Sequence, residues 1–188
     1  MDKKALFEDI SKSILTCRKC ALGNGRKNAV PGEGSVDAEI MFIGEGPGRE
    51  EDLQGRPFVG AAGKLLEELL YSIEYTRETV FIGNIIKCRP PNNRVPSQLE
   101  VDACIPYLYA QIAIIQPKII CTLGNTPLNA LISPKLTIGS VHGRLLEKDG
   151  FRFFPMYHTA AALYHGELKE ILEKDFIKLK ELLNDEQK

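Results

Sequence analysis

The sequence GEGPGREEDLQGRPFVGAAG, residues 44–63, is the strongest indication of an α/β fold in this chain. It follows an apolar run at residues 40–43 that is typical of a short buried strand, and it leads into a helical pattern that begins near Gly60. Open α/β sheets place their ligands at a glycine-rich loop between the carboxyl end of a strand and the start of a helix. A tight turn without a ligand is the alternative that the glycines alone leave open.

The charges of this loop narrow the class of ligand. The loop is long for a connection between a strand and a helix, and it carries Glu45, Glu50, Glu51 and Asp52. A phosphate cradle would instead present a lysine or bare backbone amides, and neither the dinucleotide fingerprint nor the P-loop pattern is found here. The loop is therefore predicted to hold something other than a nucleoside triphosphate.

Strands and helices alternate along the rest of the chain. Apolar, β-branched runs predict strands at residues 39–43, 79–86, 118–123 and 151–156. Helical periodicity predicts helices at residues 3–16, 60–73, 97–115, 126–132 and 167–183, the third opened by the capping box at Ser97 and Glu100. Residues 21–37 are expected to form a loop, and residues 136–146 an extended segment. The alternation predicts the α/β class: one domain over residues 1–188, built as a three-layer α/β/α sandwich around a central, mostly parallel, four-stranded sheet.

Composition places the chain among ordinary globular proteins. It has 188 residues, of which 44% are apolar and 26% are charged, and it carries no apolar run that could span a bilayer and no signal-peptide pattern. We therefore expect a cytoplasmic protein with no membrane partner. The net charge of −1 argues only weakly against a nucleic-acid partner, because acidic residues elsewhere can balance a basic face.

Four of the five cysteines have spacings that suggest a metal centre. Cys17 and Cys20 form a C-x₂-C pair, and Cys88 and Cys104 are separated by fifteen residues. Four thiolates that meet at one point suit either a zinc ion or an iron–sulfur cluster, and the spacing leaves both open, together with separately buried thiols. Cys121 lies within an apolar strand, where a free cysteine behaves as a small hydrophobic residue, so it is left out of the set.

The motifs GEGPG, EED and QGRPFVGAAG resemble the first motif of the family 4 uracil-DNA glycosylases, the iron–sulfur branch of the uracil-DNA glycosylase superfamily. The resemblance continues through Asn84, the four cysteines and a loop at His158, so it covers most of the chain. It implies a monofunctional glycosylase of base excision repair that hydrolyses the N-glycosidic bond of a flipped-out uracil and leaves an abasic site. It also implies that Cys17, Cys20, Cys88 and Cys104 hold a structural 4Fe-4S cluster.

The resemblance assigns three residues to the base. Phe58 would stack on the uracil ring, and the side chain of Asn84 would accept from N3–H and donate to O4. His158 would donate to O2, as a neutral imidazole, while negative charge grows on the departing uracil. A core phenylalanine, an asparagine that caps a strand end and a structural histidine are the alternatives for these positions.

The catalytic water is expected to depend on a carboxylate. The resemblance also places Gly46 in the uracil site. In the best-known branch of the superfamily an aspartate occupies the position that aligns with Gly46, so Glu45 is the nearest carboxylate in this chain. We expect Glu45 to orient water and to balance the sugar cation, with Glu51 in a supporting catalytic role. Gly48 aligns with the tyrosine that excludes the methyl group of thymine in that branch, so Glu51 is the candidate for this exclusion.

The His158 loop departs from the family pattern, because Thr159 occupies the place of the usual proline. Four apolar residues follow that would enter the gap left by the flipped base: Ala160, Ala161, Ala162 and Leu163. Relatives often carry a basic residue after this wedge, whereas this chain continues with Tyr164 and His165. The rigidity of the loop and its grip on DNA are the properties that these departures affect.

Uracil-containing DNA is the expected partner of a monomeric protein, with repair or replication proteins as further candidates. Basic residues near the cysteines would contact DNA phosphates, or would simply be solvated: Arg18, Lys19, Lys87, Arg89 and Arg94. The rival interpretation is a non-catalytic iron–sulfur DNA-binding module of the same fold.

Overall fold

The computed structural model describes residues 2–185, and within this range six strands form one sheet. Four parallel strands make its centre, in the spatial order β3 (Phe81–Asn84), β2 (Ile40–Gly44), β4 (Ile119–Thr122) and β6 (Phe151–Phe153). Antiparallel strands β1 (Glu33–Gly34) and β5 (Leu146–Lys148) extend the two edges. The predicted parallel centre is confirmed, and the sheet is wider than the predicted four strands because both short edge strands join it.

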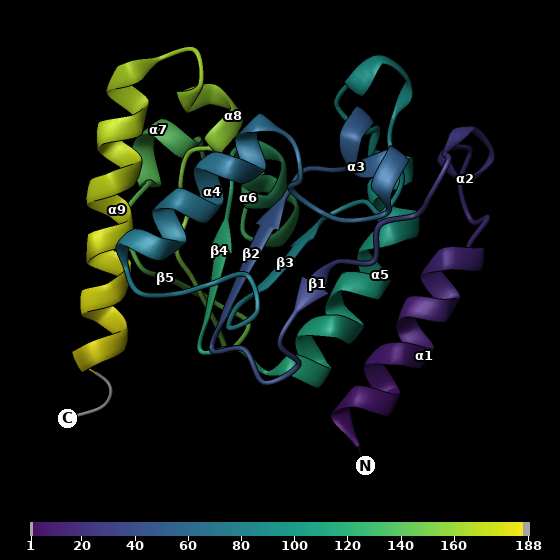
Figure 1. The fold of residues 1–188 in the computed structure, drawn as a ribbon, viewed down its shortest axis with the longest axis horizontal. Helices are drawn as coiled ribbons and strands as arrows, with labels where there is room; N and C mark the ends of the chain where they lie inside the picture. The colour runs from purple at the N-terminus through teal and green to yellow at the C-terminus, as the bar shows by residue number, and fades with distance from the viewer. Residues whose placement is uncertain (1, 186–188) are drawn as a thin grey trace.

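Helices cover both faces of the sheet, which confirms the three-layer α/β/α sandwich (Figure 1). Helices α4 (Ala61–Ser72) and α9 (Gly166–Asp185) pack on one face, and α1 (Lys3–Thr16) and α5 (Gln98–Ile115) pack on the other. Shorter helical segments lie in the connections: α2 (Leu22–Gly25), α3 (Arg49–Gln54), the 3₁₀ turn Pro91–Asn93, α6 (Asn125–Leu131), α7 (Ile138–Val141) and α8 (Thr159–Ala162). Among the described residues, no helix is long and apolar enough to cross a membrane.

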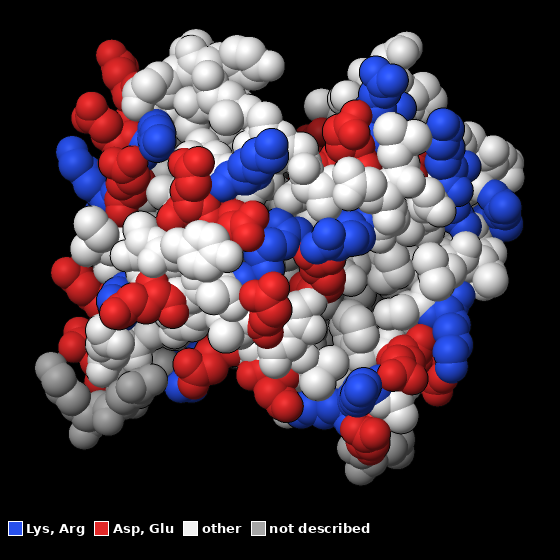
Figure 2. Space-filling model, viewed as in Figure 1, with Lys and Arg blue, Asp and Glu red and all other residues white. Residues whose placement is uncertain are grey.

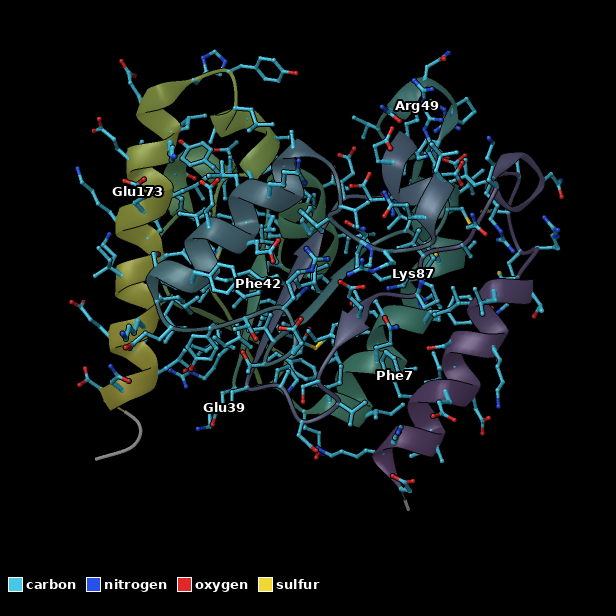
Figure 3. The ribbon with its side chains drawn as sticks, in the orientation of Figure 1. Phe7, Glu39, Phe42, Arg49, Lys87 and Glu173 are labelled. Carbon is cyan, nitrogen blue, oxygen red and sulfur yellow. The ribbon has the colours of Figure 1, made fainter. Side chains whose placement is uncertain are left out.

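Strand β2 explains why the sheet has two apolar faces. Its side chains alternate, so Ile40 and Phe42 join the core beneath α4 and α9, while Met41 and Ile43 join the core beneath α1 and α5. The ring of Phe42, labelled in Figure 3, stacks on the ring of Phe176 in α9 at a centroid distance of 5.6 Å. A strand that is buried on both faces must be apolar throughout, as residues 40–43 are.

Three segments differ from their predicted form. The expected loop at residues 21–37 contains α2 and β1, and the glycine-rich stretch contains the single-turn helix α3. The expected extended segment at residues 136–146 instead contains α7, even though its β-branched residues favour a strand. The side-chain oxygen of Asn125 accepts the backbone N–H of Ile138 at 2.8 Å and thereby anchors this helical turn, so a tertiary contact overrides the local propensity.

The carboxyl ends of the central strands meet at one edge of the sheet. Gly44 at the end of β2 pairs with Asn84 at the end of β3, and Ile43 pairs with Thr122 at the end of β4. Loops that leave these ends therefore begin side by side, and this edge carries the candidate site.

Candidate active site

A pocket opens at the carboxyl edge of the sheet, and every residue predicted for the base and the water lines it. These residues are Glu45, Gly46, Glu51, Phe58, Asn84 and His158. They come from the glycine-rich stretch, the end of β3 and the residue that begins α8. Figure 2 shows the molecule hollowed between its α8–α9 end and its α3 end, where Figure 1 places the carboxyl ends of the strands.

Phe58 and Asn84 meet over Gly44, the last residue of β2. A Cβ atom on Gly44 would lie 2.6 Å from Oδ1 of Asn84 and 2.7 Å from Cζ of Phe58, so any side chain there would displace both groups. Asn84 is 2% exposed, and among the described residues no hydrogen bond occupies its side-chain amide. Asn84 lines the pocket, so its side-chain amide is available to pair with a ligand there.

Phe58 is held in its position from behind by Arg77. The backbone of Phe58 adopts a left-handed conformation with φ 51°, which is strained for a bulky side chain. Arg77 donates to the carbonyl oxygens of Phe58 at 2.8 Å and Pro57 at 2.6 Å, and it forms an ion pair with Glu33 at 2.6 Å. Sequence reasoning missed Arg77 and Glu33, because nothing in their local pattern separates them from surface charges.

His158 is a neutral hydrogen-bond donor in this pocket. It caps the amino end of α8, and its Nδ1 atom accepts the backbone N–H of Ala160 at 3.0 Å. Burial lowers the pKa of His158 to about 4, although the Glu51 carboxylate acts in the opposite direction. The ring is therefore neutral at physiological pH with its proton on Nε2, and it stacks on Phe58 at a centroid distance of 5.6 Å.

Glu51 is fully engaged by the backbone of the loop that carries it. One carboxylate oxygen accepts the N–H of Gly48 at 3.1 Å, and the other accepts those of Val59 at 2.9 Å and Gly60 at 3.0 Å. A Cβ atom on Gly48 would lie 2.8 Å from the Glu51 carboxylate, so the glycine makes room for this contact. Glu51 thus joins the start of α3 to the start of α4 across the pocket wall.

Glu45 keeps one carboxylate oxygen available. Its Oε2 atom accepts the hydroxyl of Thr126 at 2.5 Å, and among the described residues nothing hydrogen-bonds to Oε1. The neighbouring Gly46 cannot carry a carboxylate, because a Cβ atom there would lie 2.6 Å from the side chain of Ile86. Thr126 is a third residue that the sequence did not identify, since it lies 81 positions further along the chain.

The four residues predicted to enter the gap left by the flipped base have different environments in the structure. Ala160 lines the pocket and Ala162 is buried in the core, whereas Leu163 is 43% exposed at the end of α8. Tyr164, which follows, is 85% exposed. The exposed apolar surface of this loop therefore belongs to Leu163 and Tyr164.

Thr159 occupies the first position of α8 and is fully buried. Its hydroxyl has no hydrogen-bond partner in the described part of the chain. The loop keeps its helical turn without the family's proline.

The four predicted metal-ligating cysteines surround one cavity between α1, α2, the loop after β3 and α5: Cys17, Cys20, Cys88 and Cys104. All are free thiols, and burial raises the pKa of Cys104 to about 11. Arg26 donates to the sulfur of Cys88 at 2.9 Å, and the backbone N–H of Lys87 donates to that of Cys104 at 3.3 Å. Donors of this kind support thiolates in metal centres. Cys121 is fully buried in β4, away from this set.

Lys87 cannot contact DNA, which corrects one of the predicted phosphate contacts. It is 1% exposed, and Figure 3 shows it inside the molecule beside α5. Its ammonium group donates to Gln111 at 2.8 Å, and Gln111 donates to the carbonyl of Pro31 at 2.8 Å. Arg94 is exposed near the pocket, where it pairs with Glu100 at 2.7 Å.

A sequence model of the uracil DNA glycosylase superfamily matches residues 31–183, which include the whole pocket. The chain belongs to this superfamily. Within it, the chain is similar to type-4 uracil-DNA glycosylases. The protein of that name from Sulfurisphaera tokodaii is 50% identical over 94% of this chain and 84% of its own length. The one from Saccharolobus solfataricus is 50% identical over 93% and 85%, and the one from Archaeoglobus fulgidus is 45% identical over 96% and 95%.

These matches identify the chain as a member of the type-4 uracil-DNA glycosylases, and their extents also bear on the cysteines. The superfamily match begins at residue 31, after α1 and the Cys17–Cys20 pair. The type-4 enzyme of Thermotoga maritima instead aligns with 98% of this chain, which leaves too few residues outside the alignment to omit that pair. The amino-terminal cysteines therefore lie in a segment shared with the type-4 relatives.

Proposed function

We propose that this type-4 uracil-DNA glycosylase hydrolyses the N-glycosidic bond of a uracil flipped out of DNA and leaves an abasic site. The observation that carries the proposal is the meeting of three groups in one pocket. These are the unpaired amide of Asn84, the ring of Phe58 and the neutral imidazole of His158. A uracil ring needs an amide for its edge, an aromatic face and a donor for its growing charge.

Recognition falls to Asn84 and Phe58. The Asn84 side chain accepts from N3–H and donates to O4 of uracil, and the base lies on the Phe58 ring. Because Gly44 has no side chain, Asn84 and Phe58 both pack against its backbone and already lie side by side before a base enters. This preorganisation favours the bound state without reorganisation of the protein.

Charge stabilisation falls to His158 and Glu45. The Nε2–H of His158 donates to O2 of uracil as the glycosidic bond breaks and the base becomes an anion. On the other side of that bond, the free oxygen of Glu45 accepts a hydrogen bond from the attacking water, and the carboxylate stabilises the cationic sugar. Neutral imidazole is suited to the first role because it gives a hydrogen bond without transferring a full proton.

Glu51 supports catalysis by holding the pocket wall, because its carboxylate joins the backbone at Gly48 to that at Val59 and Gly60. The same wall limits the space beside the base, so we assign the exclusion of thymine's methyl group to Glu51 and the backbone that it holds. Gly46 contributes its backbone alone, packed against Ile86.

We place the DNA strand across the hollow of the protein surface that is visible in Figure 2. Residues 153–168, which include the α8 side, contain no Lys or Arg, and we assign Leu163 to the gap left by the flipped base. The opposite side carries basic residues, among them Arg49, which Figure 3 places at the outer rim of α3, and Arg94. Phosphate contacts on this side make binding dependent on salt despite the net charge of −1.

The four cysteines fit a 4Fe-4S cluster. They line one cavity, and N–H groups donate to the sulfurs of Cys17, Cys88 and Cys104. Four cysteine thiolates are the usual donor set of a 4Fe-4S cluster. When bound, the cluster would join α1, the loop after β3 and α5 and contribute its binding energy to folding.

An oligonucleotide assay tests the proposed activity. The protein is incubated with single- and double-stranded DNA that contains one uracil, and alkali then cleaves the strand at abasic sites. Asn84→Ala should slow single-turnover excision by about two to four decades, because both edge contacts are lost, and should leave affinity for abasic DNA nearly unchanged. Asn24→Ala, an exposed asparagine outside the pocket, is the matched control.

Two results would overturn the proposal. If the wild-type protein binds the DNA without excising uracil, the rival DNA-binding module is correct. If Asn84→Ala excises uracil at the wild-type rate, Asn84 is a structural residue and the base lies elsewhere.

A further inference from the structure

We infer that Thr126 is a positioning residue that orients the Glu45 carboxylate for catalysis. This inference rests on the proposed role of Glu45. Thr126 is the second residue of α6, and its hydroxyl donates to Oε2 of Glu45 at 2.5 Å. Hydrogen bonds from a hydroxyl to a carboxylate are short and strong, so this contact fixes the carboxylate plane.

The contact gives the two carboxylate oxygens of Glu45 different roles. Oε2 is occupied by Thr126, while Oε1 has no hydrogen-bond partner among the described residues and Glu45 lines the pocket. Without Thr126, rotation of the carboxylate would present either oxygen, in any orientation, to water. With it, one oxygen in one orientation remains, and orientation of this kind is a large part of what an enzyme contributes to the rate.

The position of Thr126 is itself fixed by the fold. Glu45 directly follows β2 and Thr126 follows β4, and these strands are parallel neighbours, so the two residues leave the same edge side by side. Asn125 anchors the start of α6 by accepting the N–H of Ile138 at 2.8 Å. The threonine is thus a rigid donor rather than a mobile surface hydroxyl.

The turn between β4 and α6 also contacts His158, on the opposite side of the pocket from Glu45. Gly124, which precedes α6, has a φ of +88°, and a Cβ atom built on it would lie 3.3 Å from Cβ of His158. The turn between β4 and α6 therefore packs against His158 and hydrogen-bonds to Glu45. It sets the spacing between the residue that acts on the base and the residue that acts on the sugar.

Single-turnover excision of uracil tests the inference. Thr126→Val keeps the shape and removes the donor, and it should slow excision by about 10- to 100-fold, the usual worth of one hydrogen bond to a charged group. Affinity for DNA carrying a non-cleavable uracil analogue should change less than about threefold, because Thr126 does not contact the base. Thr126→Ser keeps the donor and should restore the rate to within a few-fold of wild type.

Thr122→Val is the matched control. It makes the same chemical change in the preceding strand, and the Thr122 hydroxyl has no hydrogen-bond partner in the described range. Its excision rate should equal that of the wild type. Slowing as large as that of Thr126→Val would show that the effect comes from repacking near β4, and would overturn the inference.

A double-mutant cycle separates action through Glu45 from an independent effect. In a Glu45→Ala background, Thr126→Val should slow excision no further, because the group that it orients is gone. If the two losses instead multiply, Thr126 does not act through Glu45 and the inference fails. A wild-type protein that does not excise uracil would refute the proposed function, whereas an active wild type with an equally active Thr126→Val would refute the role of Thr126 alone.

Discussion

The backbone N–H of Ala160 donates to Nδ1 of His158 over 3.0 Å, and this one contact determines which ring nitrogen faces the pocket as a donor. A nitrogen that accepts a hydrogen bond cannot carry the proton, so the proton of the neutral ring lies on Nε2. One N–H at the amino end of α8 thus completes the cap of the helix and sets the tautomer of the His158 imidazole.

The pH dependence of His158 follows from its burial. Its folded-state pKa of about 4 lies below the ordinary value of 6.5, so the ring stays neutral from pH 8 to about pH 5. The stability linked to this group is fully present above pH 6.5 and is lost as the pH falls toward 4. Protonation of His158 should therefore not reduce the excision rate above about pH 5.

Nitrogen-15 NMR of the imidazole signals checks this prediction, with the His158→Asn variant used to assign the signal. We expect the pattern of a neutral Nε2–H tautomer that persists down to about pH 5. A midpoint near pH 6.5, or a proton on Nδ1, would contradict it.

Arg77 should matter more for stability and base binding than its place outside the pocket suggests. Arg77→Lys removes the planar donor that serves Phe58, Pro57 and Glu33 together, so the strained φ of Phe58 loses its support. We expect a loss of about 2–4 kcal/mol in the free energy of unfolding, measured by urea denaturation, together with weaker binding of uracil.

Arg56→Lys provides the comparison, because Arg56 pairs with the same Glu33 from an exposed position. It should cost less than about 1 kcal/mol, as exposed ion pairs usually do. Equal losses for the two variants would mean that the ion pair with Glu33, rather than the two carbonyl contacts, carries the effect.

Much of the fold could be predicted because it depends on local patterns. The capping box at Ser97 and Glu100 predicted the start of α5, and apolar runs predicted the four parallel strands. The edge strands β1 and β5 were missed because they have two and three residues and depend on pairing with β3 and β6.

In the candidate site, too, residues within local motifs could be predicted and contacts between distant segments could not. Phe58, Asn84 and His158 lie in motifs and could be named from the sequence, and they do line one pocket. The different surroundings of Glu45 and Glu51 could not be predicted, because they depend on backbone donors and on a hydroxyl from a distant turn. Every residue except proline has a backbone N–H, so the sequence does not indicate which of them will donate to Glu51.

Thr159→Pro should stabilise the protein by about 0.5–1 kcal/mol, since proline restricts the unfolded chain. Position 159 is the first of α8, where proline fits, and the preceding His158 has a ψ of 135° that proline tolerates. The substitution also removes a buried hydroxyl without a partner in the described range. Urea denaturation measures the change, and Thr159→Val, which removes the hydroxyl alone, separates the two contributions. A proline variant less stable than the valine variant would show that proline does not fit the first position of α8.

Arg26 should control how firmly the cysteine centre holds the proposed cluster. Its guanidinium donates to the sulfur of Cys88 at 2.9 Å and to the carbonyl of Leu15 in α1 at 2.8 Å, so it joins the end of α1 to the loop after β3 that carries Cys88. Burial raises the pKa of the Cys88 thiol, and Arg26 opposes that rise by stabilising the thiolate. Arg26→Gln should lower the reduction potential of the bound cluster, because removal of a positive charge disfavours the added electron, and should speed cluster loss in air.

Iron analysis, visible absorbance over time and a redox titration measure these effects on protein purified without oxygen. The wild type should hold about four irons per chain, and Cys88→Ala should lose the colour. Lys27→Gln makes a similar change of charge at an exposed neighbour and should behave as the wild type. The reduction potential of Arg26→Lys should lie between those of the wild type and Arg26→Gln, because lysine keeps the charge but not the paired donors. If Arg26→Gln matches the wild type in iron content, decay and potential, the contact with Cys88 contributes only to packing.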